Sequence, residues 1–249
     1  MINPSIFIGA PLYFKDICKI YPPSVKDVVS NPQYAQWNRL LTITMEDIKD
    51  QFKAQEEVVY PTPLEFLLIN CHYNKQFLTI AHAALEFFLR EPVTFLEEQK
   101  MIVIGTREEI EERGKKQIPF RALNEDNYFD FQNLIRTACG DKVVKPPEPE
   151  DPNEDPRIRR IKQKARERDR IKARQGNKSG ITLDTILVSI CCMGLGITPL
   201  NIGEMSYASI SELIRVYQDK EKYDLDVRSL LAGADSKKIK PKYWIRNTD

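Results

Sequence analysis

Apolar residues recur at helical spacing along most of the chain. Residues 63–89 are the most apolar stretch of its first half, and apolar positions there repeat every three or four residues, which predicts two adjoining core helices. Another helix is expected from Glu125 to Ala138, with Gly140 as its stop, because glycine commonly follows a helix end. The pattern therefore predicts a mainly α fold class.

Two small β-hairpins are expected in the same part of the chain. Apolar residues on both sides of the Gly-Ala-Pro sequence at residues 9–11 predict a hairpin that turns there, before Pro22 and Pro23. Residues 93–96 and 101–104, joined by the polar residues 97–100, predict a second hairpin.

Helix starts are marked by capping boxes, in which a hydroxyl and a carboxylate three residues later satisfy backbone N–H groups at the helix N-terminus. Three pairs have this spacing: Ser24 with Asp27, Thr44 with Asp47, and Thr62 with Glu65. Each is expected to begin a helix.

Charge divides the chain into parts, although its 249 residues are nearly neutral, with 37 basic and 36 acidic side chains. Residues 141–155 hold four prolines, two basic and six acidic residues, which predicts an extended linker. Residues 157–178 hold eleven basic and two acidic residues and follow Asp155-Pro156, a strong helix start. We expect an N-terminal mainly helical domain at 1–140, the Pro/acidic linker, a basic helical arm at 156–178 and a C-terminal helical domain at 179–249.

The C-terminal domain is expected to contain three helices. The first runs from Thr182 to about Met193, and the second starts at Ser206 and carries apolar residues at i, i+3, i+4 and i+7. A separate short helix with Val227, Leu230 and Leu231 is expected to end at Gly233.

The sequence predicts a protein without membrane spans. Residues 185–203 carry no charge, but their three glycines and one proline break the helix that a span requires. The first sixteen residues lack the basic start and long apolar core of a signal peptide. Five cysteines without a C-x-x-C pair indicate reduced thiols, as in cytosolic proteins.

Catalysis is not expected. The chain holds only two histidines, His72 and His82, without a zinc-ligand cluster or a nucleophile motif around them. The Gly194-Leu195-Gly196 sequence lacks the third glycine of a dinucleotide fingerprint, and helix termination explains it. We therefore expect no enzyme, no metal and no cofactor.

The basic arm is the sharpest candidate for a binding site. Its cations can neutralise phosphates of nucleic acid, bind an acidic protein surface, or form a merely solvated helix, and the sequence leaves these three readings open. The arm carries Arg157, Arg159, Arg160, Lys162, Lys164, Arg166, Arg168, Arg170, Lys172 and Arg174. The C-terminal tail is a second basic candidate, with Lys237, Lys238, Lys240, Lys242, Tyr243, Trp244 and Arg246.

Residues 181–247 resemble the C-terminal part of tail-assembly proteins of tailed phages that infect Gram-positive bacteria. The similarity is strongest in DVRSLLAGADSKKIKPKYWIRN, and IYPPSVKDVV and FDFQNLIRTACG are also similar to phage tail-module products. The layout resembles the long form of a tail assembly chaperone. This resemblance implies a non-catalytic, homo-oligomeric protein of the host cytoplasm that binds the tape-measure protein and recruits tail-tube subunits.

Binding tape-measure helices would require an exposed apolar groove. The helix pair at residues 63–89 is the candidate, although the same pattern is expected of plain core. Its candidate groove residues are Leu64, Leu67, Leu68, Phe77 and Ile80. Two alternatives remain: a nucleic-acid-binding accessory protein that acts through the basic arm, and a structural component of the tail or baseplate.

Overall fold

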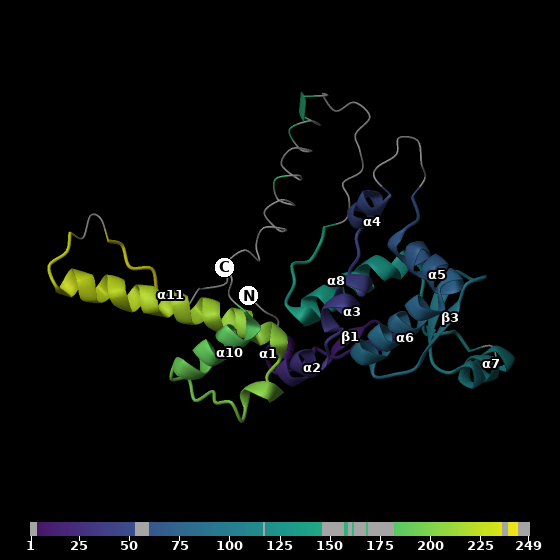
Figure 1. Cartoon of the computed structure of the whole chain (residues 1–249), viewed down its shortest axis with the longest axis horizontal. Helices are drawn as coiled ribbons and strands as arrows, with labels where there is room; N and C mark the ends of the chain where they lie inside the picture. The colour runs from purple at the N-terminus through teal and green to yellow at the C-terminus, as the bar shows by residue number, and fades with distance from the viewer. Residues whose placement is uncertain are drawn as a thin grey trace. The chain divides into compact units, whose positions relative to one another are not determined.

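A computed structural model describes residues 4–52, 60–116, 118–145, 157–158, 161, 168, 182–235 and 239–243. These residues form helices and two small antiparallel sheets, which confirms the predicted mainly α fold class (Figure 1). The chain divides into two compact units, one of residues 1–143 with 203–249 and the other of residues 144–202. The domain boundaries expected from the sequence stay a prediction, and residues 146–155 of the expected linker lie outside the described residues.

The elements follow one another in a simple order. The helices are α1 (Pro4–Phe7), α2 (Val25–Ser30), α3 (Tyr34–Leu41), α4 (Met45–Gln51), α5 (Pro63–Tyr73), α6 (Lys75–Leu89), α7 (Arg107–Lys115), α8 (Glu125–Cys139), α10 (Leu183–Cys192), the 3-10 helix η1 (Ile202–Glu204) and α11 (Tyr207–Leu231). The strands are β1 (Leu12–Phe14), β2 (Cys18–Ile20), β3 (Val93–Leu96), β4 (Met101–Ile104) and β5 (Ala122–Leu123).

All three predicted capping boxes are present. Ser24, Thr44 and Thr62 each accept a hydrogen bond from the backbone N–H three residues later, and the carboxylate at that position accepts one from the cap residue. These reciprocal bonds satisfy two donors that a helix start leaves without a partner. Thr106 and Glu109 form a further box at the start of α7, which the sequence reading missed.

The second hairpin agrees with its prediction and the first does not. Strands β3 and β4 pair with Val93 opposite Ile104, as expected, and β5 adds a third strand. In the first hairpin, however, the turn lies at residues 15–17, because Leu12 and Phe14 pair with Ile20 and Cys18. Those four side chains are buried on one face, and this alternation decides the register.

The main hydrophobic core lies between α3, α5, α6, α8 and the first hairpin. Leu85 and Phe88 of α6 and Phe131 and Ile135 of α8 are fully buried at its centre. Gln132 of α8 donates hydrogen bonds to the carbonyls of Leu41 and Ile43, at the end of α3. These bonds join α8 to the carbonyls around the α3 C-terminus, which would otherwise be buried without a donor.

The start of α11 packs against the N-terminal part of the same unit. Ser206 pairs with Ser24 as an antiparallel bridge, and the Tyr207 N–H donates to the carbonyl of Pro23 at 2.8 Å. The Tyr207 ring meets Tyr34 edge-on, with ring centroids 5.9 Å apart. Residues 203–210 are therefore part of the first unit.

Helix α11 is one continuous helix of 25 residues. The separation of residues 227–231 into a further short helix was wrong, since α11 ends at Leu231 and the described residues between 217 and 227 are all helical. Only Ala208, Ser209 and Ile210 of α11 are fully buried, and they lie in the first turn, where the helix packs against α1 and α8.

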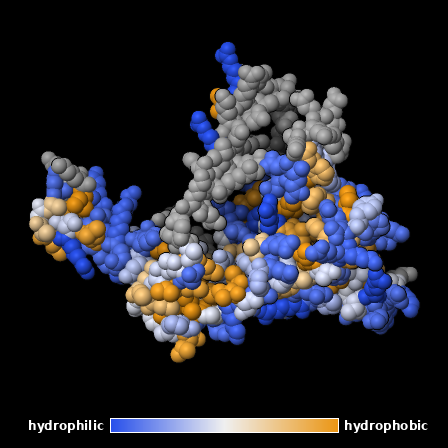
Figure 2. All heavy atoms as spheres, in the orientation of Figure 1, coloured by the Kyte–Doolittle hydropathy of each residue, from blue (hydrophilic) through white to orange (hydrophobic). Residues whose placement is uncertain are grey.

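The second unit contains α10, which begins after Thr182 as predicted. Ile190 is its buried residue, and Leu183, Ile186 and Leu187 are half-buried. Apolar atoms gather over α10 in Figure 2. No helix in the described part of the chain is both long and apolar enough to span a membrane.

Candidate functional site: a groove along α5

A groove with a volume of about 530 Å³ runs along one side of α5. The segment before α5 and the turn between β3 and β4 form its edges. It is lined by Tyr60, Pro61, Glu65, Leu68, Ile69, His72, Tyr73, Glu97 and Lys100. The groove thus combines an aromatic and aliphatic surface with two pairs of charged or ionisable side chains.

Helix α5 carries apolar residues around most of its circumference, interrupted by Glu65, Asn70 and His72, but only part of that circumference is covered. Leu64, Leu67 and Leu68 face the main core, and Phe66 packs into a smaller cluster with Ile43 and Ile48. Between these covered sides, Ile69 is 49% exposed and Tyr73 is 82% exposed. A helix that is apolar all round is normally covered all round, so the open side of α5 has the composition of a contact surface.

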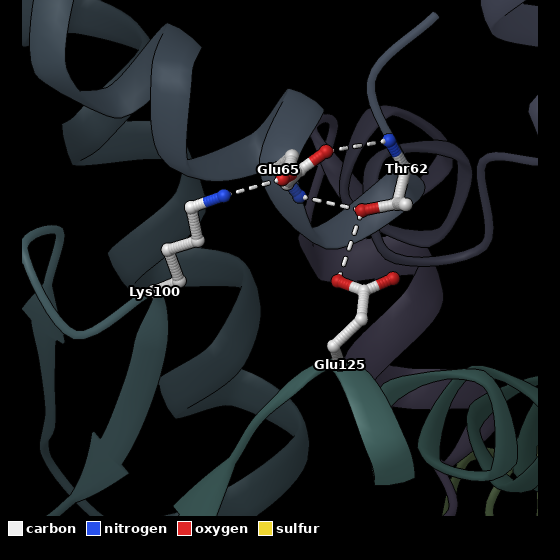
Figure 3. A network of polar contacts seen from close by, with 4 residues as sticks. All are labelled: Thr62, Glu65, Lys100 and Glu125. Carbon is white, nitrogen blue, oxygen red and sulfur yellow. Dashed lines mark hydrogen bonds and ion pairs between the residues drawn. The ribbon is translucent and has the colours of Figure 1, made fainter.

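A polar network holds the start of α5 in place (Figure 3). The Lys100 ammonium donates to Glu65 at 2.8 Å, and the Thr62 hydroxyl donates to Glu125 of α8 at 3.0 Å. Glu65 also accepts from the Thr62 backbone N–H at 3.2 Å. Together these bonds tie the cap of α5 to the β3–β4 turn and to α8.

The electrostatics of this rim follow from the same contacts. The hydrogen bond from Lys100, followed by that from the Thr62 backbone, lowers the pKa of Glu65 below its ordinary value. The same hydrogen bond to Glu65 raises the pKa of Lys100. Both groups therefore stay charged at neutral pH and mark one end of the groove.

The two histidines occupy different surroundings. His72 contacts the carboxylate of Glu97 through Nδ1 and lies on the groove, whereas His82 of α6 packs edge-on against Phe95. Burial lowers the pKa of His82, which favours its neutral form. Neither histidine lies in a cluster of three or more metal-ligating side chains among the described residues.

The residues expected to line a groove are placed mostly in the core. Leu64 and Leu67 are buried there, and Phe77 and Ile80 are partly buried against it. Leu68 is also buried in the core, but it lines the groove as well. Sequence reasoning missed Ile69 and Tyr73, the exposed apolar residues of the same helix. The spacing of Leu64, Leu67, Leu68 and Cys71 at i, i+3, i+4 and i+7 marks the core side of α5, but no local signal shows that Ile69 and Tyr73 stay exposed on the other side.

Only parts of the two basic candidates are described. Arg157 and Arg168 of the arm are helical and exposed, and the arm's other basic residues lie outside the described residues. Lys240, Lys242 and Tyr243 of the tail line a second cavity with α11. The remaining tail candidates, Lys237, Lys238, Trp244 and Arg246, also lie outside the described residues.

Comparison with known proteins finds a related family for one part of the chain. Residues 173–249 match the family model described as YomV second domain. The match is to a phage-derived family of Gram-positive bacteria and covers less than a third of the chain. It fits a phage-related protein, which confirms the resemblance at that level. No curated protein and no solved structure gives a significant match.

The matched region does not coincide with one compact unit. Residues 173–202 belong to the second unit, and residues 203–249 belong to the first, where α11 begins against α1 and α8. The part of the match that includes α11 is therefore anchored on the N-terminal half of the chain.

Proposed function

We propose that this phage-related protein is a non-catalytic tail assembly protein that binds the tape-measure protein and recruits tail-tube subunits. The observation that carries the proposal is the exposed apolar side of α5. A tape-measure protein is expected to present long amphipathic helices, and a groove with an apolar floor and charged ends is a common acceptor for such helices.

The geometry of the groove supports a helical ligand. Ile69 and Tyr73 are four residues apart and lie on one side of α5, so they present a short apolar strip parallel to the helix axis. Lys100 with Glu65 and His72 with Glu97 add polar partners beside this strip. Full burial of a large apolar side chain contributes about 1.5–3 kcal/mol. Ile69 is 49% exposed and Tyr73 is 82% exposed, so both side chains can contribute as anchors of the contact.

The proposal is tested by affinity purification of the tagged chain from cells that express its neighbouring proteins, with and without nuclease. We expect a very long helical protein and an abundant tube subunit to co-purify in both cases. Recovery of nucleic acid, together with loss of the protein partners after nuclease treatment, would contradict the proposal.

Two substitutions locate the contact. Ile69→Asp and Tyr73→Ala should each reduce tape-measure binding by about thirtyfold, the effect of losing an interface residue worth about 2 kcal/mol. Val29→Asp and Tyr13→Ala are matched controls, because these residues lie elsewhere and are 60% and 70% exposed. Equal binding by the groove variants and the controls would exclude the groove as the contact.

A second candidate function rests on the basic arm. Its net charge of +9, from eleven basic and two acidic residues at 157–178, supports salt-dependent binding of nucleic acid. Deletion of residues 156–178 should then abolish nucleic-acid binding, whereas tape-measure binding through α5 should survive the same deletion.

A further inference from the structure

Beyond its buried first turn, α11 carries a seam with the spacing of a coiled coil, apolar at five of its six positions and lysine at the sixth. Its residues follow one another at alternating steps of three and four: Leu213, Val216, Lys220, Tyr223, Val227 and Leu230. This spacing places them in one line along the helix, about 26 Å long at 1.5 Å per residue. All six are half-buried, whereas Leu225 on the opposite side is 64% exposed.

Acidic residues border this seam. Glu212, Asp219 and Asp226 are spaced by seven residues, so they form one flank, and Asp224 lies on the other. Three of these four acids pair along the helix: Arg215 contacts Glu212 and lies 3.1 Å from Asp219, and Lys220 lies 2.8 Å from Asp224. No basic residue occupies a flank position, because Arg215, Lys222 and Arg228 lie farther round the helix.

A second copy of α11 is a poor match for this surface. In a parallel pair, Asp219 of one helix would face Asp224 of the other. In an antiparallel pair, the flank with Glu212, Asp219 and Asp226 would face the same flank of the second helix. Lys220 would also lie inside the apolar seam of both helices. Like charges in these positions disfavour association. A helix with basic residues on both flanks has the complementary charge.

The chain's own basic tail already lies against the seam. Tyr243 meets Tyr223 edge-on, with ring centroids 5.5 Å apart. Lys240 and Lys242 line the same cavity as Asp219 and Asp226. This cavity has a volume of about 580 Å³, so the tail contacts the seam at Tyr223 without filling the space beside it. The tail therefore shows which chemistry the seam accepts: aromatic contact flanked by lysine.

We propose that the seam of α11 docks an amphipathic helix with basic flanks, and that residues 239–243 compete with this helix for the seam. The docked helix would place apolar side chains against Val216, Tyr223 and Val227. Its basic side chains would lie beside Asp219 and Asp226. This inference is independent of tape-measure binding, because it concerns a different surface and predicts the charge of the ligand.

The test uses the full chain and two synthetic helical peptides of three heptads with leucine at the seam positions. One peptide has lysine at all flank positions and the other has glutamate. Calorimetry should show that the lysine peptide binds at least about tenfold more tightly, as expected for complementary against opposing charge. Deletion of residues 239–249 should strengthen binding of the lysine peptide further.

Variants of α11 assign the binding to the seam. Val227→Asp should remove peptide binding, whereas Leu225→Asp, the matched control on the opposite side, should not. Asp219→Lys combined with Asp226→Lys should reverse the preference, so that the glutamate peptide binds more tightly, and this gain of binding cannot arise from misfolding.

Three outcomes would overturn the proposal. They are equal binding of the two peptides, no binding by the tail-deleted chain, and a dimer in sedimentation analysis that Val227→Asp dissociates. The last result would identify a second copy as the occupant. None of them bears on the α5 groove, which Ile69→Asp tests separately.

Discussion

Substitution of Gly140 by alanine tests whether α11 is anchored on the N-terminal part of the chain. Gly140 ends α8 with a φ of +78°, a conformation that glycine adopts without strain. A Cβ added there would lie 3.0 Å from both Cα and Cβ of Ala208 in the first turn of α11. The substitution therefore combines backbone strain with a collision across the α8–α11 contact.

The two costs can be separated with a matched glycine. Gly9 has a φ of +71° and no atom within 4 Å of an added Cβ, so Gly9→Ala should cost only the left-handed strain, about 1–2 kcal/mol. Gly140→Ala should cost about 1–3 kcal/mol more, the range for an overpacked contact. Ala208→Gly should relieve part of this excess, because it removes one of the two colliding atoms.

The assay is urea unfolding followed by tryptophan fluorescence. The chain has two tryptophans, so the Trp244→Phe background leaves the buried Trp37 as the only reporter in the first unit. A double-mutant cycle of Gly140→Ala and Ala208→Gly should give a coupling of about 1 kcal/mol. Equal losses for Gly140→Ala and Gly9→Ala, with no coupling, would refute the packing of α11 against α8.

Other properties follow from the groove and the thiols. Thr62→Ala should lower the free energy of unfolding by about 1 kcal/mol through loss of the α5 cap, measured by urea unfolding against Thr62→Ser. Glu65→Gln should destabilise the protein at pH 7. The pKa of Glu65 is lowered in the folded state, so the stability difference between the two proteins should shrink as the pH falls below about 4.3 and through the folded pKa. A difference that stays constant with pH would contradict the pairing with Lys100. Ellman's reagent at pH 8 should modify Cys191 and Cys192 rapidly, but the three buried cysteines only after unfolding, because burial raises the pKa of each buried thiol to about 12. Rapid reaction of all five thiols would contradict their burial.

Local features of the fold were predictable because they depend on residues a few positions apart. The cap of α5 needs only Thr62 and Glu65, and the stop of α8 needs only Gly140. The second hairpin was found because its polar turn and both of its strands lie within twelve residues. The turn of the first hairpin was misplaced because the Gly-Ala-Pro sequence at residues 9–11 is the stronger local turn signal. The chain does turn at Gly9, which has a positive φ, but so does Lys15, and the burial of Leu12 and Phe14 shows that the hairpin turn is the one at Lys15.

The candidate site could be predicted only in part. Residues 63–89 were correctly expected to form two helices, but the covered side of α5 depends on α4 and α6, which meet it from different directions. Ile69 and Leu68 are adjacent and similar in hydrophobicity, and both line the groove, yet Ile69 is 49% exposed whereas Leu68 is buried in the core. Helical spacing places Leu68 with Leu64 and Leu67 on the core side, but only the neighbours of α5 decide that the side carrying Ile69 stays open.

The sequence by itself determined the helix starts, the second hairpin, the charge segregation and the similarity of the C-terminal region to phage proteins. The tertiary structure alone decided that Ser206 pairs with Ser24 and that Ile69 and Tyr73 are exposed. The physical reason is the range of the interactions. Caps and turns are hydrogen-bonded within a few residues, whereas the contacts that place α11 and open the side of α5 join residues that are distant in the chain.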